Sequence, residues 1–108
     1  TDKDCVAEFK KAISQRLDDS ELSVETLGSL FGMSRVQLYR KIKNLTNYTP
    51  IEIIRITRLK AAQQLLASSD LTVAEITYQV GFTSPSYFTK CYKEYFGENP
   101  NDTRSRKK

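Results

Sequence analysis

The sequence predicts an all-α protein with two helix-turn-helix units joined by a long linker helix, a tandem homeodomain-like arrangement. The first observation behind this prediction is an internal repeat in a chain of 108 residues. Residues 22–50 and 71–100 align at an offset of 49, which becomes 50 after one inserted residue in the second turn. The second observation is that apolar residues recur at helical spacing, whereas no segment alternates as a strand would.

A leading helix is expected ahead of the first copy. Val6, Phe9, Ile13 and Leu17 follow one another at spacings of three and four residues. This spacing predicts a single apolar stripe along an amphipathic helix.

Each copy begins with a short helix that carries its own start and stop signals. Ser23 is the expected N-cap in the first copy, and Thr72 is its counterpart in the second. Glu75 lies three residues after Thr72 and completes a capping box. Gly32 and Gly81 are expected to end these helices, because glycine adopts the left-handed C′ conformation at low cost.

A second, longer helix restarts immediately in each copy. Ser34 with Gln37 forms a predicted capping box, and Ser84 followed by Pro85 is the equivalent start. These helices are expected to end at the two residue types that best tolerate positive φ. The two stop residues are Asn47 and Gly97.

The linker helix opens at Pro50, inside the capping box of Thr49 and Glu52, and ends before Asp70. Its apolar residues cover much of its circumference, and its roughly 19 residues would span about 28 Å. The expected segments are 1–49, with the leading helix and first helix-turn-helix, 50–69, the linker, and 70–108, the second helix-turn-helix and a mobile basic tail.

Composition argues against several classes of protein. Hydrophobic residues make up 39% and charged residues 28%, as in soluble globular domains. No apolar run approaches a membrane span, and no signal peptide opens the chain. Histidine is absent, and Cys5 and Cys91 alone do not make a zinc site. We therefore expect no enzyme activity, no catalytic residues, no metal, no cofactor and two reduced cysteines.

The charge alternates along the chain. The net charge of +4 divides into −3 for residues 1–34, +6 for 35–60, −2 for 61–82 and +3 for 83–108. Such runs are often solvated faces. Two basic blocks on one small domain are also expected of a surface that binds a polyanion at two points.

The second helix of each copy has one face that is expected to pack in the core and an opposite face that is expected to be exposed. Leu38, Ile42 and Leu45 form the expected core stripe in the first copy, and Phe88, Tyr92 and Tyr95 form it in the second. The opposite faces carry basic and short polar side chains, which donate to base edges and phosphates in a major groove. These candidate DNA-binding residues are Arg35, Val36, Tyr39, Arg40 and Lys43 in the first copy and Ser84, Ser86, Thr89, Lys90 and Lys93 in the second.

These residues together resemble the DNA-binding domain of AraC/XylS-type transcription regulators, from about Asp4 to Arg104. The resemblance is carried by SRVQLYRK at 34–41, the linker pattern at 54–66 and the segment from Val80 to Pro100. The sequence of residues 34–50 also resembles the output domain of the large hybrid two-component regulators of Bacteroidetes. In the AraC/XylS family both helix-turn-helices contact one face of bent DNA, and the first usually reads sequence more strictly.

The resemblance implies separate roles for the candidate residues. Arg35, Val36, Tyr39 and Arg40 are expected to read bases, although Arg40 also fits a phosphate or structural role because its counterpart is basic. Lys43, Lys93 and the set Arg55, Arg58 and Lys60 are expected to bind phosphates or to pair within the chain with the acidic first helix. Tyr87, Tyr92, Tyr95 and Phe96 are expected in the core.

The sequence departs from the family pattern at four positions. Gly28 and Thr77 stand where alanine is common, and glycine should weaken its helix by up to ~1 kcal/mol. Lys90 replaces a frequent arginine, which exchanges a bidentate fork for a point charge. Thr103 replaces an aromatic anchor, so the last turn lacks its expected support.

The predicted function is sequence-specific binding of double-stranded DNA by a cytoplasmic bacterial transcription regulator, with two recognition helices in adjacent major grooves. RNA polymerase is an expected further partner, membrane contact is not expected, and dimerisation is expected through regions outside this chain. The alternative is a helical protein–protein interaction module without specific DNA readout.

Overall fold

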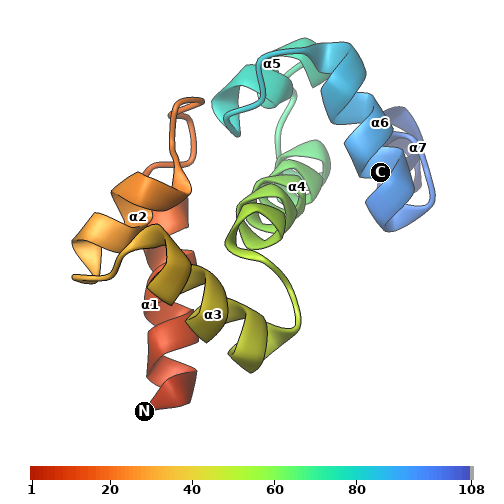
Figure 1. The fold of residues 1–108 in the computed structure, drawn as a ribbon. Coiled ribbons are helices and arrows are strands. Elements are labelled where there is room, and N and C mark those ends of the chain that lie inside the picture. The colour runs from red at the N-terminus through yellow and green to blue at the C-terminus, as the bar shows by residue number, and fades with distance from the viewer. Residues whose placement is uncertain (108) are drawn as a thin grey trace. The chain divides into compact units, whose positions relative to one another are not determined.

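A computed structural model describes residues 1–107, which fold into seven helices without a strand in that range. Contacts divide the chain into two compact units, residues 1–16 with 21–57 and residues 17–20 with 58 onward, so the division falls inside α4. The helices are α1 (Asp2–Gln15), α2 (Val24–Leu30), α3 (Arg35–Thr46), α4 (Pro50–Ser68), α5 (Val73–Gln79), α6 (Pro85–Phe96) and α7 (Pro100–Lys107) (Figure 1).

The first unit packs α1 against both α2 and α3. Phe9 and Ile13 from α1 meet Leu27, Leu38 and Ile42 in a core whose side chains are almost fully buried. Burial of side chains of this size is the main favourable term for so small a unit. Helices α2 and α3 thus form a helix-turn-helix supported by α1.

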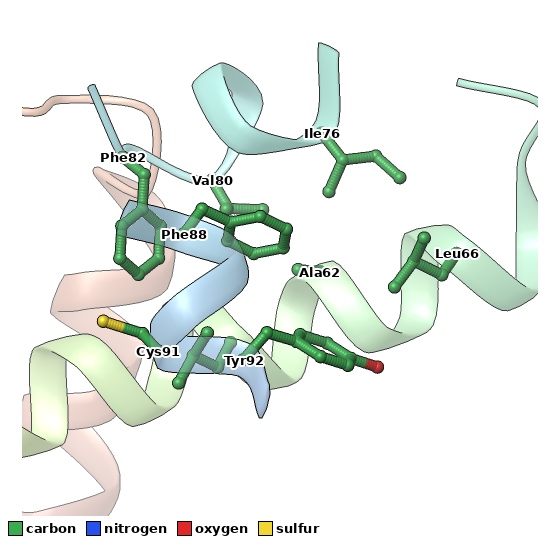
Figure 2. Close-up of a cluster of buried hydrophobic side chains, with 9 residues drawn as sticks. Ala62, Leu66, Ile76, Val80, Phe82, Phe88, Cys91 and Tyr92 are labelled. Atoms are coloured by element: carbon green, nitrogen blue, oxygen red, sulfur yellow. The ribbon is translucent and has the colours of Figure 1, made fainter. Parts of the chain in front are cut away.

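The second unit is built around an aromatic cluster. Figure 2 shows side chains of α5, α6 and the later part of α4 converging on one core. Phe88 contacts Phe82 and Tyr92 with ring centroids 5.3 and 5.7 Å apart, and Tyr92 contacts Phe96 at 4.6 Å. These tilted and edge-on contacts add to the burial of apolar area. Helices α5 and α6 form the second helix-turn-helix.

The structure confirms the predicted helix signals. The N-cap side chains of Ser23, Ser34, Thr72 and Ser84 each accept the backbone N–H three residues later. The residues predicted to end the helices all have positive φ. They are Gly32, Asn47, Gly81 and Gly97.

The prediction that Leu17 continues the stripe of α1 is wrong. The helix ends at Gln15, and Leu17 packs instead against the core of the second unit. Residues 17–20 therefore belong to the second unit although they lie between α1 and α2 in sequence. The three remaining positions of the stripe lie in α1, and two of them, Phe9 and Ile13, are buried.

The prediction of a mobile basic tail is also wrong for the part that the structure describes, because α7 extends to Lys107. Thr103 is fully buried, accepts the Tyr92 hydroxyl at 2.7 Å and donates to Glu98. Arg104 donates to the carbonyls of Leu66 and Ser69 at 3.3 and 3.2 Å. A polar cluster therefore replaces the missing aromatic anchor, and Lys108 lies outside the described residues.

Candidate nucleic-acid interface

Helix α3 is positioned by strong local signals at both ends. Gln37 N–H donates to Ser34 Oγ at 3.2 Å, and Ser34 N–H donates to Gln37 Oε1 at 2.8 Å. This capping box satisfies two backbone donors that the first turn leaves free. Asn47 ends the helix with φ of 65°. The exposed face of α3 is therefore held in register by its own sequence.

The two faces of α3 differ as expected. Leu38 and Ile42 are buried against the rest of the first unit. On the opposite face Val36 is 57% and Tyr39 46% exposed. Exposed apolar and aromatic side chains beside basic ones suit contact with base edges, including the thymine methyl group. The other candidates on this face, all exposed, are Arg35, Arg40 and Lys43.

The three basic residues of α3 differ in what they contact. Arg35 Nη1 lies 3.4 Å from Glu25 Oε1 in an exposed ion pair. Lys43 Nζ donates to the Asn47 carbonyl at 2.9 Å and so covers the end of the helix. For Arg40 the described part of the chain offers no hydrogen-bond or ion-pair partner. Of the three basic side chains on this face, Arg40 is thus the one without a hydrogen bond or ion pair to the described residues.

A small depression adjoins this face within the first unit. Its volume is about 160 Å³, and it lies between α3 and the starts of α2 and α4. The walls are mainly apolar, and Arg35 is the charged residue among them. The residues that line it are Val24, Arg35, Tyr39, Thr49, Pro50 and Ile51.

Helix α6 presents a less basic face. Ser84 is its N-cap, accepting from Tyr87 N–H at 3.3 Å, and its Oγ lies 3.2 Å from Ser86 Oγ. Thr89, predicted on the open face, is half-buried. The remaining candidates, Ser86, Lys90 and Lys93, are exposed. On α6 the exposed candidates are thus Ser86, Lys90 and Lys93, whereas Ser84 and Thr89 are partly buried.

Two aromatic residues of α6 that the sequence predicts in the core are exposed. Tyr95, expected in the core stripe, is 41% exposed, and Phe96 packs against the buried cluster in its place. Tyr87, also expected in the core, is 49% exposed. The repeat carries a signal for Tyr87, because the aligned residue of the first copy, Gln37, is a surface capping residue.

The basic residues of α4 separate into different roles. Arg58 Nη2 donates to the Asp19 carbonyl at 2.7 Å, and its Nε is buried without a hydrogen-bond partner. Burial lowers the pKa of Arg58, and the charge of Asp19 opposes this shift. Arg58 therefore pairs within the second unit, with the segment that follows α1 and not with α1 itself as one expectation had it. Arg55 is half-buried and Lys60 is exposed.

The carboxylate in the first turn of α4, that of Glu52, caps the start of this helix. Glu52 Oε1 accepts Thr49 N–H at 2.9 Å, and this backbone hydrogen bond is the main reason that the pKa of Glu52 is lowered. Among the described residues no three His, Cys, Asp or Glu side chains gather to hold a metal ion. No described helix is long and apolar enough to cross a membrane.

A comparison with protein families supports this geometry. The profile described as "Helix-turn-helix domain" matches residues 27–106. The chain belongs to the AraC/XylS-type helix-turn-helix DNA-binding domains. The match runs from the middle of α2 to near the end of α7.

Curated relatives of this AraC/XylS-type domain are longer proteins. The chain is 40% identical over 96 residues to "Histidine kinase P4" of Formosa agariphila, which covers 89% of this chain and 7% of the relative. It is 35% identical over 99 residues to the "Msm operon regulatory protein" of Streptococcus mutans, covering 92% of this chain and 35% of that protein. The chain thus spans well under two thirds of these relatives.

Solved structures share the fold. The DNA-binding domain of AdpA, in complex with a target DNA, superposes with a TM-score of 0.84 at 30% identity, covering 93% of this chain and 89% of that chain. The C-terminal domain of AraT, a response regulator from Geobacillus stearothermophilus, superposes with a TM-score of 0.85 at 29% identity. The shared region is 94% of this chain and 84% of that chain.

Proposed function

We propose that this domain binds a specific duplex DNA sequence through the outer faces of α3 and α6 and that it serves a bacterial transcription regulator. The observation that carries the proposal is the outer face of α3, where Arg40 is unpaired within the described residues and lies on the same helix as the exposed Val36 and Tyr39. Arginine and apolar side chains on one helix face supply both donors and methyl contacts for base edges.

The two helices have different roles in this proposal. Helix α3 reads bases, because it offers guanidinium groups, whose planar fork suits bidentate contact with guanine. Helix α6 mainly positions the domain on the phosphates, because its exposed charges are the point charges of Lys90 and Lys93. Ser84 and Ser86 add hydroxyl groups at the start of α6.

The setting of the domain is part of the same proposal. The recognition helices enter successive major grooves, connected by the 19-residue helix α4. The domain is the DNA-binding end of a longer cytoplasmic protein, a hybrid two-component regulator. This is supported by the match to a histidine kinase of Formosa agariphila and by the likeness to a response-regulator domain. RNA polymerase is the proposed further partner, and dimerisation resides outside this chain.

Duplex binding as a function of salt tests the proposal. A site is first selected from random duplexes, and its affinity is then measured between low and high salt beside a scrambled duplex of equal composition. We expect log K to fall linearly with log[salt], by about 0.9 per phosphate contacted, and the selected site to bind more tightly. As a control, Lys11→Ala removes one exposed positive charge from α1, outside the proposed DNA-binding faces, and should change the affinity and its salt dependence little. A flat salt dependence would contradict the proposal.

One observation favours a second candidate, the helical protein–protein interaction module. A groove of about 480 Å³ lies between α1 and the end of α3 in the first unit, with Val6, Ala7 and Leu45 among its lining residues. Apolar walls with charged rims are common where partner helices bind. Failure of every duplex to bind at low salt would favour this candidate.

A further inference from the structure

The ion pair between Glu25 and Arg35 connects the two helices of the first helix-turn-helix. Glu25 lies in the first turn of α2, and Arg35 is the first residue of α3. Their side chains are 60% and 65% exposed, with 3.4 Å between Oε1 and Nη1. Ion pairs this exposed contribute little to stability. Folding therefore depends little on this pair.

Local helix chemistry favours Glu25, an acidic residue in the first turn of α2, but it does not favour Arg35. A cation at the first position of a helix faces the positive end of the helix dipole, which is unfavourable for Arg35. Glu25 is not a capping-box partner either, because Ser23 accepts from the amide of Thr26, the residue in the capping position. Both side chains are thus available for a role at the surface.

The repeat supplies an internal comparison. The residues aligned with Glu25 and Arg35 in the second copy are Ala74 and Pro85, neither of which carries a charge. In that copy the acidic residue, Glu75, is instead used by the capping box with Thr72. The ion pair is therefore confined to the unit that we propose reads bases.

We infer that Glu25 is a specificity-determining residue that acts by positioning Arg35; this rests on the proposed function. A guanidinium has five N–H donors, so Arg35 can keep one edge on Glu25 and offer the others to a guanine. A move of Arg35 to a phosphate would leave the Glu25 carboxylate unpaired beside the negative charge of DNA. Such an unpaired charge disfavours the contact of Arg35 with a phosphate more than its contact with a guanine.

The surroundings of Arg35 support this assignment. Arg35 also lines the depression formed with Val24, Tyr39 and Ile51, whose walls are mainly apolar. The Thr49 hydroxyl, which also lines it, already accepts Glu52 N–H at 3.1 Å. Among the described residues, Glu25 is the ion-pair partner of Arg35.

A double-mutant cycle with two duplexes tests the inference. Affinities of the wild type, Glu25→Gln, Arg35→Gln and the double variant are measured against the selected and the scrambled duplex. We expect Glu25→Gln to strengthen binding to the scrambled duplex about threefold to tenfold and to steepen its salt dependence by about one phosphate contact. Binding to the selected duplex should change by less than about twofold, so discrimination falls.

The Arg35→Gln background distinguishes an effect of Glu25 that acts through Arg35 from a direct effect of its negative charge on DNA. In the Arg35→Gln background, Glu25→Gln should no longer change discrimination, because its effect passes through Arg35. Glu8→Gln in α1 removes the same charge elsewhere and should leave discrimination unchanged. Equal strengthening of both duplexes by Glu25→Gln, or the same effect without Arg35, would overturn the inference. A wild type that binds neither duplex would instead overturn the proposed function itself.

Discussion

In the first helix-turn-helix the N–H of Met33 donates to the Gly28 carbonyl at 2.9 Å, and in the second the N–H of Phe82 donates to the Thr77 carbonyl at 3.0 Å. The two turns thus share one hydrogen bond at aligned positions. They differ in length, since Thr83 is the extra residue of the second turn. A Cβ on Gly28 would lie 2.6 Å from the Met33 carbonyl oxygen, whereas the second turn accommodates a buried threonine at 77.

This comparison changes the meaning of Gly28. By helix propensity alone, this glycine is a residue that weakens its helix. The structure shows that the shorter first turn brings a backbone carbonyl to a distance that only glycine accepts. The insertion in the second turn removes this requirement, which is the reason that the two copies diverge at an otherwise equivalent position.

The largest effect is expected at the second turn, where Gly81 has φ of +95° and a Cβ would meet the Leu17 carbonyl oxygen at 2.2 Å and Arg58 Nε at 2.7 Å. Gly81→Ala combines backbone strain with a clash against buried groups, so we expect a loss of roughly 2–5 kcal/mol in unfolding free energy. Gly32, with φ of +65°, has nothing within 4 Å of such an atom. Gly32→Ala should cost about 1–2 kcal/mol. Urea unfolding of both variants measures the difference, and equal losses would contradict the account of the second turn.

The next effect separates the roles of α3 and α6. Arg40→Ala should reduce affinity for the selected duplex by about 1–3 kcal/mol and relax preference at one base position, and Val36→Ala should relax preference in the same way. Lys93→Ala should weaken all duplexes alike and reduce the salt slope by about one contact. Competition binding with single-base variants of the selected site measures both. Equal changes in base preference for the two helices would remove the distinction between them.

The smallest effect distinguishes the starts of α2 and α5. Glu75 accepts Thr72 N–H at 2.9 Å, and this backbone hydrogen bond is the main cause of its lowered pKa. Because folding lowers the pKa of Glu75 below 4.5, the stabilisation it contributes is present above about pH 4.5 and is lost as the pH falls through the folded value.

The Thr72 amide reports this titration directly. We expect its NMR shift to change with a midpoint below 4.5, whereas the amide of Ser23, whose capping position holds Thr26, should lack that transition. Glu75→Gln should abolish the transition at Thr72. Persistence of the transition in that variant would show that another group causes it.

The sequence predicted the local features of this protein well. Each cap that it indicated is present, because an N-cap or a left-handed stop depends on groups within three or four residues of one another. The buried stripe through Leu38 and Ile42 is confirmed for the same reason, since helical periodicity alone determines which residues share a face. The resemblance to the AraC/XylS family is confirmed by the family match over residues 27–106.

The tertiary structure decided which side chains meet across the chain. It placed Leu17 in the second core, left Tyr95 exposed, and turned the expected tail into a helix held by Thr103. It also paired Glu25 with Arg35 and buried Arg58 against the residues that follow α1. These outcomes depend on where one element ends relative to another, and no local periodicity carries that information.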